Sequence, residues 1–209
     1  MPEGSASKGT CFWLEEQRVV VPDIDSGGYI LDIGGGGEGI IGKLKGNRVI
    51  AIDLSRDELL EATNDALKIV MDARDMRFVD ESFWTVTSFF TLMYVEPSDV
   101  AKVFREAYRV LKPGGRFLIW DVEIPPRKDG DPDVFVVPLL VVLPGTTIRT
   151  AYGVLWEGRQ QNAELVASLG EATGFLPVSQ AEHGQVFELR LLKPGETVSG
   201  VPCRAPDAQ

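Results

Sequence analysis

The chain has few of the residues that build metal sites and disulfide frameworks. Its 209 residues include two cysteines, Cys11 and Cys203, and one histidine, His183. A structural zinc site needs four closely spaced Cys or His ligands, so this composition argues against one. The cysteines stand near opposite ends of the chain, which does not suggest a disulfide scaffold. We therefore predict no metal centre.

Positive charge is also scarce. There are 21 Lys and Arg against 31 Asp and Glu, which gives a net charge of −10. Because nucleic-acid binding normally requires a basic face that releases counterions, DNA and RNA are not expected as partners. No apolar run is long enough to span a bilayer, and residues 1–10 lack the apolar stretch of a signal peptide. We expect a cytoplasmic protein that binds neither nucleic acid nor membrane.

Glycine, by contrast, is concentrated in one stretch. Residues 29–42 read YILDIGGGGEGIIG, in which five glycines fall within six positions. Glycine costs backbone entropy, and the usual reason for such a cluster is a ligand that approaches the backbone at the start of a helix. Gly34, Gly36 and Gly39, with Asp53 further on, also fit an NAD-binding loop. A tight turn without a ligand is the remaining alternative.

Around this loop, short apolar runs alternate with helical segments. Strands are predicted at 29–33, 48–52, 68–71, 84–88 and 116–120, and helices at 39–44, 56–64 and 99–111. Ser55 and Ser98 are expected to cap the last two of these helices. A helix at 161–172 and two closing strands at 175–180 and 185–192, paired antiparallel, complete the pattern. The chain therefore predicts an α/β fold with a mostly parallel sheet and helices on both faces.

Polar residues recur where the predicted strands end. Asp32, Asp53, Asp72, Ser88 and Asp121 each stand at or just past the carboxyl end of a strand. In parallel sheets these ends share one edge, and ligands bind in the crevice outside it. One acidic residue there could be an ordinary helix cap, but the recurrence predicts a functional site.

Residues 123–156 interrupt the alternation. Two β-rich runs at 134–143 and 146–156 flank Pro144 and Gly145, which predicts an inserted β-hairpin arm. The first run is too apolar for an exposed arm, so we expect it to be buried as a lid over the site, in a homodimer interface, or as an extension of the core. The predicted organisation is an N-terminal extension (1–28), a main domain (29–193) that includes this arm, and a C-terminal tail (194–209).

Five motifs in order point to one family. They are LDIGGGGEG (31–39), AIDLS (51–55), MDARD (71–75), VTSFFTLMY (86–94) and VLKPGGRFLIWD (110–121). With these motifs the chain resembles the class I S-adenosylmethionine-dependent methyltransferases, in particular the small methyltransferase-domain group. The resemblance implies a Rossmann-like sheet of seven strands, one of them antiparallel, and S-adenosylmethionine as cofactor. The family usually carries glycine where this chain has Glu38, so the loop contacts there are expected to differ.

The resemblance also implies roles around the methionine part of the cofactor. Gly34, Gly35 and Gly36 would line it. Asp32 would hold its ammonium group, directly or through water, because a cation favours an acidic neighbour. Ser88 would lie near the methionine part or the transferring methyl group.

The remaining matched residues would bind the nucleoside. Asp53 would accept hydrogen bonds from both ribose hydroxyls, as a carboxylate can do with its two oxygens. Leu54 would pack on the adenine face. Asp72 would accept from the adenine amino group, with the Ala73 backbone beside it.

Methyl transfer from a sulfonium is an in-line displacement in which the protein mainly supplies alignment. No dedicated general base is evident, since Tyr94, Asp121 and Glu123 are only candidates near the expected pocket and His183 falls in a late turn. The catalytic residues are therefore unassigned. We predict a methyltransferase that acts on a small-molecule acceptor. The alternatives are a cofactor-binding protein of this fold that has lost catalysis and serves as a regulator or partner subunit, and an NAD-dependent enzyme.

Overall fold

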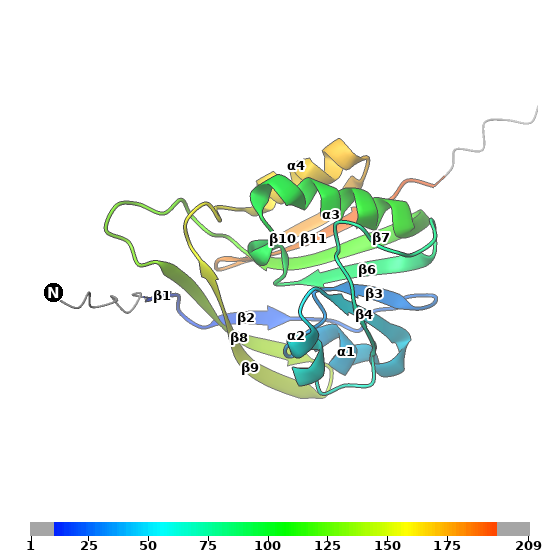
Figure 1. Ribbon diagram of the computed structural model, residues 1–209, viewed down its shortest axis with the longest axis horizontal. Coiled ribbons are helices and arrows are strands. Elements are labelled where there is room, and N and C mark those ends of the chain that lie inside the picture. The colour runs from blue at the N-terminus through cyan, green and yellow to red at the C-terminus, as the bar shows by residue number, and fades with distance from the viewer. Residues whose placement is uncertain (1–10, 196–209) are drawn as a thin grey trace, which may run out of the picture.

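The computed structural model describes residues 11–195 and contains two sheets (Figure 1). The larger has seven strands in the order β10-β11-β7-β6-β3-β4-β5. Their bounds are Leu176–His183 (β10), Val186–Leu192 (β11), Leu111–Val122 (β7), Phe83–Phe89 (β6), Ile30–Ile33 (β3), Val49–Asp53 (β4) and Leu67–Val70 (β5). β11 runs antiparallel to both of its neighbours, whereas β7, β6, β3, β4 and β5 are mutually parallel. The predicted fold class is therefore confirmed.

Helices cover both faces of this sheet. α3 (Pro97–Val110) and α4 (Ala163–Thr173) lie on one face, and α1 (Ile40–Lys45) and α2 (Arg56–Glu61) lie on the other (Figure 1). Two short 3-10 turns, η1 (Gly46–Arg48) and η2 (Leu92–Tyr94), connect elements. Every residue of β3 is buried, as expected for a central strand that is covered on both sides.

The predicted helix caps met different outcomes. The Ser55 hydroxyl accepts a hydrogen bond from Glu58 N at 3.3 Å, so this capping prediction is confirmed, although α2 ends at Glu61. The prediction for Ser98 is wrong, because α3 begins earlier, with Glu96 at the cap and Pro97 in the first turn. Proline suits that position because its missing N–H has no helical partner to lose.

The segment after α3 also differs from expectation. The predicted strand at 116–120 is longer, because β7 begins at Leu111 directly after the helix. The pairing with β6 shifts register between Leu111 and Arg116, so the Lys-Pro-Gly-Gly segment forms an irregularity within the strand rather than a separate turn. Gly114 has φ +80°, a left-handed conformation that glycine adopts without strain.

The second sheet is built on the predicted arm. β8 (Val134–Leu143) and β9 (Thr146–Leu155) form the antiparallel hairpin. On its other side β8 pairs in parallel with β1 (Cys11–Trp13) and β2 (Gln17–Val20). The part of the predicted N-terminal extension that the structure describes is thus joined to the arm. Most of the predicted C-terminal tail, 196–209, lies outside the described residues.

The apolar run of the arm is buried within the chain. Alternate residues of β8, among them Phe135, Val137, Leu139 and Val141, are fully buried in a cluster that also holds Trp120 of the large sheet. A second cluster lies between the large sheet and α3 and α4. The arm therefore extends the core, and its burial does not by itself require a second copy.

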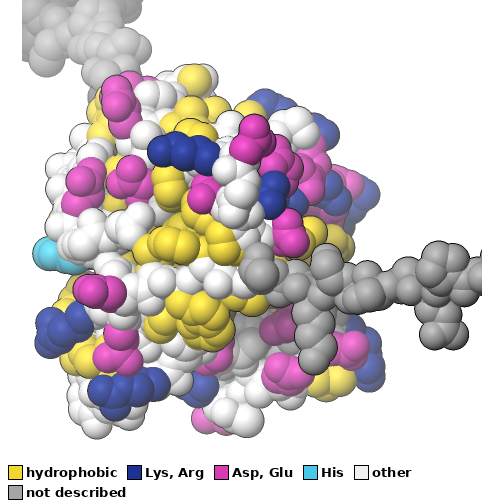
Figure 2. All heavy atoms as spheres, turned by 90° about the vertical axis from the view of Figure 1, so that its left-hand side faces the viewer, with side chains coloured by type: hydrophobic (Ala, Val, Ile, Leu, Met, Phe, Trp, Pro, Cys, Tyr) yellow, Lys and Arg dark blue, Asp and Glu magenta, His cyan; other side chains and the backbone are white. Residues whose placement is uncertain are grey.

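The surface near β1 and the start of the arm carries a patch of hydrophobic side chains that charged residues surround (Figure 2). The exposed apolar side chains of the second sheet include Phe12, Trp13 and Leu155. Within residues 11–195, no helix is long and apolar enough to cross a bilayer.

Candidate functional site

A cavity of about 560 Å³ opens at the carboxyl ends of the parallel strands. Its walls come from the ends of β3, β4 and β6, from the segment after β5, from η2, and from β9 of the arm. A volume of this size is ordinary for a small-molecule site. Six of the nine predicted site residues line it, and these are Gly34, Gly36, Asp53, Leu54, Asp72 and Ala73.

The glycine loop after β3 is fixed by protein contacts as well as being open to the cavity. The amides of Gly34 and Gly35 both donate to Ile52 O of β4, at 2.8 and 3.1 Å. A Cβ on Gly34, which has φ +73°, would lie 2.2 Å from the Thr91 hydroxyl oxygen. A Cβ on Gly36 would lie 2.6 Å from Glu58 Cβ. The loop therefore needs glycine for its own close packing, in addition to any approach by a ligand.

Asp53 ends β4 and lines the cavity with both oxygens anchored. Oδ1 accepts from Ser55 N at 2.8 Å, and Oδ2 accepts from Gly36 N at 3.3 Å. A carboxylate can accept about four hydrogen bonds, so each oxygen retains capacity for a further donor. The arrangement suits a ligand with two adjacent hydroxyl groups.

Asp72 follows β5, the strand that pairs with β4, and is held by Arg74. Two guanidinium nitrogens donate to its carboxylate, the shorter contact being 2.7 Å. These hydrogen bonds lower the pKa of Asp72, so it is ionised at neutral pH. Arg74 also pairs with Asp99 at the start of α3, which ties the segment after β5 to that helix. Leu54 and Ala73, which directly follow Asp53 and Asp72 in the chain, contribute apolar side chains to the lining of the cavity.

Three predicted residues do not line the cavity. Asp32 is buried beneath the loop, where it accepts from the Thr87 hydroxyl at 2.7 Å. Its burial raises its pKa to about 7. Gly35 packs against Ala51, and Ser88 is fully buried with no hydrogen-bond partner for its hydroxyl among the described residues. Their predicted contacts would reach a ligand only indirectly in this arrangement.

The three candidate bases are placed very differently. Tyr94 lines the cavity, and burial raises its pKa to about 12, so its hydroxyl stays protonated at neutral pH. Asp121 is fully buried away from the cavity and accepts from Leu92 N at 2.9 Å and from Gln161 Nε2 at 2.7 Å. It therefore holds the turn that carries Tyr94 rather than facing a ligand.

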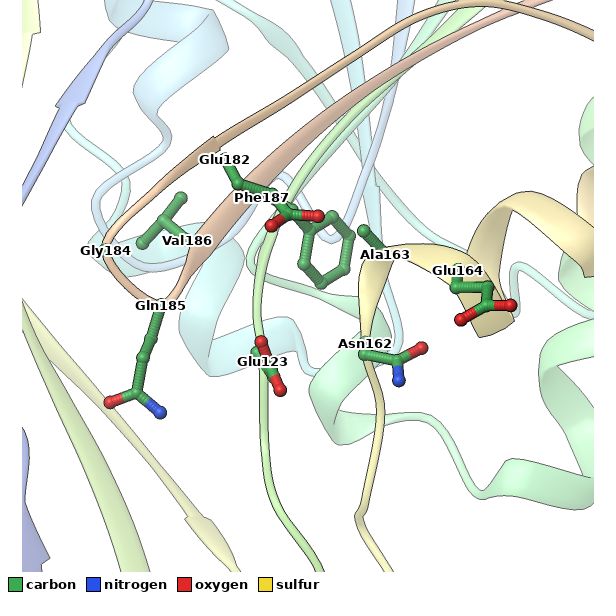
Figure 3. Close-up of a pocket in the computed structure, with 9 residues that line it drawn as sticks. All are labelled: Glu123, Asn162, Ala163, Glu164, Glu182, Gly184, Gln185, Val186 and Phe187. Carbon is green, nitrogen blue, oxygen red and sulfur yellow. The ribbon is translucent and has the colours of Figure 1, made fainter.

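Glu123, the third candidate, lines a separate cavity of about 140 Å³ between the end of β7, the start of α4 and the β10–β11 turn (Figure 3). The side chains of Glu123, Asn162 and Gln185 stand around it. His183 is exposed at the end of β10, as expected for a turn residue. Across residues 11–195, no group of His, Cys, Asp or Glu could hold a metal ion.

The arm supplies residues that the sequence did not point to. Tyr152 and Gly153 of β9 line the cavity, and the Tyr152 ring stacks on Phe90 with centroids 5.5 Å apart. Phe90 has φ +49°, a strained conformation for a bulky residue that is often found at functional positions. Glu38 accepts a hydrogen bond from the Thr150 hydroxyl of β9, so it joins the glycine loop to the arm.

The methyltransferase-domain family matches residues 31–119 of this chain. A ubiquinone/menaquinone biosynthesis C-methyltransferase from Rickettsia typhi is 31% identical over 51% of this chain and 48% of its own length. A demethylmenaquinone methyltransferase from Clavibacter sepedonicus is 37% identical over 64% of this chain and 58% of its own length. The chain thus spans about half the length of the curated relatives it matches.

Among solved structures, the fold is similar to that of an S-adenosylmethionine-dependent methyltransferase from Mesorhizobium loti. The TM-score is 0.57 at 17% identity, over 78% of this chain and 90% of the other. At this identity the likeness supports the fold alone.

Proposed function

We propose that this chain, whose residues 31–119 match the methyltransferase-domain family, is a class I S-adenosylmethionine-dependent methyltransferase that methylates a small-molecule acceptor with S-adenosylmethionine as the methyl donor. The observation that carries the proposal is the donor set of the cavity. Asp53 and Asp72, which stand at the ends of the neighbouring strands β4 and β5, both line it together with the apolar side chains of Leu54 and Ala73, and this set suits a nucleoside with its ribose at Asp53. The charged residues that line the cavity are Asp53, Glu58, Asp72 and Glu96 against the single cation Arg74, and a cationic sulfonium favours such an acidic excess.

Residues that line the cavity would bind the cofactor and orient the acceptor. Asp53 would accept from the ribose hydroxyls, while Leu54 and Ala73 would flank the adenine and Asp72 would accept from its amino group. When bound, the cofactor supplies an electrophilic methyl group. Phe90 and Tyr152 would exclude water and orient an acceptor, which is how a protein gains rate in a displacement of this kind.

Proton handling would not rest on Tyr94 or Asp121. Tyr94 keeps its proton at neutral pH because its pKa is raised, so it can donate a hydrogen bond to a ligand but not accept a proton from one. Asp121 would act as a positioning residue through the backbone of Leu92.

The acceptor is proposed from this chain alone. The family match ends at residue 119, before the arm that lines the acceptor side of the cavity. The acceptors that appear in the names of the relatives are therefore not carried over to this chain. A small molecule is favoured because the chain carries a net charge of −10 and because β9 of the second sheet borders the cavity with Tyr152 and Gly153.

The test is the destination of a labelled methyl group. The protein would be incubated with methyl-labelled S-adenosylmethionine and a cell extract that is afterwards separated into small-molecule and macromolecular fractions. We expect label in the small-molecule fraction, its loss with Asp53→Ala, and its retention with Asp65→Ala, an exposed aspartate that does not line the cavity. Label in protein or nucleic acid would contradict the small-molecule acceptor, and no transfer at all would favour the non-catalytic alternative.

A further inference from the structure

A second cavity, of about 450 Å³, lies beside the one described above. The two cavities share Gly37, Glu58, Tyr94 and Tyr152 as lining residues. It opens between the glycine loop, α2 and β9 of the arm. A molecule that occupied it would therefore touch residues that also border the proposed cofactor site. An acceptor bound there would lie beside the cofactor without displacing it.

Two tyrosine rings line this second cavity, and one of them is firmly supported. Tyr152 stacks on the buried ring of Phe90 with an interplanar angle of 28°. Tyr94 lies in the turn η2, where its backbone oxygen accepts from Arg159 at 3.2 Å. Burial raises the pKa of both hydroxyls, so the rings stay uncharged at neutral pH. The faces of such rings attract cations.

The charged groups of this cavity are predominantly acidic. Glu38, Glu58 and Glu61 line it, against the single cation Lys43. Glu38 is held in place by the hydrogen bond from Thr150. Partial burial, followed by the repulsion of neighbouring carboxylates, raises the pKa of Glu58. A bound cation would relieve this repulsion, whereas a bound anion would add to it.

We propose, resting on the proposed methyl transfer, that the acceptor is a small molecule bearing an alkylammonium group, which binds in this second cavity between Tyr94, Tyr152 and the carboxylate of Glu38. The two rings contact the apolar stem and present their faces to the ammonium group, and the Glu38 carboxylate supplies the counter-charge.

Three matched probes test the assignment on the 209-residue chain saturated with S-adenosylhomocysteine. Phenethylamine, 2-phenylethanol and 3-phenylpropionate have a similar apolar body but carry a cation, a neutral hydroxyl and an anion. By calorimetry we expect phenethylamine to bind about tenfold more tightly than the alcohol, with no measurable binding of the acid. Equal or tighter binding of the alcohol or the acid would overturn the proposal, as would no binding of any probe.

Substitutions distinguish a failure of the alkylammonium assignment from a failure of the proposed methyl transfer. Glu38→Gln keeps the shape and an acceptor for Thr150 but removes the charge, so it should abolish the preference for the amine. Tyr152→Leu should weaken amine binding, and Glu171→Gln, an exposed control on α4, should leave it unchanged. If S-adenosylhomocysteine itself fails to bind, the proposed function is contradicted. If it binds but the amine preference survives Glu38→Gln, only the alkylammonium assignment is contradicted.

Discussion

Asp32 offers the sharpest quantitative prediction. Its carboxylate is 2% exposed and makes one side-chain hydrogen bond, from Thr87 at 2.7 Å. Burial raises its pKa from 3.8 to about 7. Between pH 3.8 and about pH 7, Asp32 is protonated in the native state and ionised in the unfolded state. The free energy of unfolding therefore falls as the pH rises through this range.

The size of the effect follows from that shift. One pKa unit corresponds to about 1.4 kcal/mol, so ionised Asp32 costs the native state up to about 4 kcal/mol relative to its protonated form. Between about pH 5.5 and about pH 8.5, roughly 2 kcal/mol of this stability is lost. Asp121 is equally buried with a pKa also raised to about 7, so it should add a loss of similar size.

Asp32→Asn isolates the first contribution. The amide has nearly the same shape and can still accept from Thr87, but it does not titrate. Urea unfolding followed by tryptophan fluorescence should show that the wild type loses about 4 kcal/mol between the two pH values and the variant about 2 kcal/mol. Asp57→Asn, on the exposed face of α2, should keep the wild-type loss. An Asp32→Asn variant with the full wild-type pH dependence would refute the reasoning.

Three further predictions concern the cofactor site and the segment that follows β5. If Asp32 holds the cofactor ammonium as the resemblance implies, binding favours its ionised form, so calorimetric affinity for S-adenosylmethionine should rise from about pH 6 to about pH 8 in the wild type and stay flat in Asp32→Asn. Gly36→Ala places a Cβ 2.6 Å from Glu58 Cβ and 2.9 Å from Asp53 Oδ2, so it should lower both cofactor affinity and melting temperature. A Cβ at Gly195 would have no atom within 4 Å, so Gly195→Ala should change neither quantity. Arg109 donates hydrogen bonds to Phe78 O and Met76 O. Arg109→Ala should therefore lower the free energy of urea unfolding by about 2 kcal/mol and increase amide hydrogen exchange in residues 71–82. Unchanged exchange there would show that Arg109 does not hold this segment.

The central sheet could be predicted because its signals are local. β3 and β4 are continuous apolar runs that end in or next to Asp32 and Asp53, and both strands form within a residue or two of the predicted bounds. The Ser55 cap depends on a contact three residues away and was equally readable. Ser98 was misassigned because Pro97 competes for the same helix start, and proline at the first turn decided it.

The acceptor side of the site could not be predicted, because it depends on contacts between distant segments. Tyr152 reaches the cavity only because β9 pairs with β8 and the arm packs on the large sheet. Glu38 meets Thr150 across 112 positions of sequence. Neither hydrophobic periodicity nor a local motif predicts contacts between segments so far apart in the sequence. The same limit applies to Asp32, whose strand-end position was visible but whose orientation toward Thr87 is set by the neighbouring strand.

The central claim, a nucleoside site for S-adenosylmethionine at the carboxyl edge of the sheet, is tested most directly by calorimetric titration of the purified chain. S-adenosylmethionine, S-adenosylhomocysteine and NAD would be titrated into the wild type, Asp53→Ala and the exposed control Asp65→Ala. We expect micromolar binding of both sulfur nucleosides to the wild type and the control, loss of this binding in Asp53→Ala, and no binding of NAD. Binding of NAD alone, or sulfur-nucleoside affinity that is indifferent to Asp53→Ala, would contradict it.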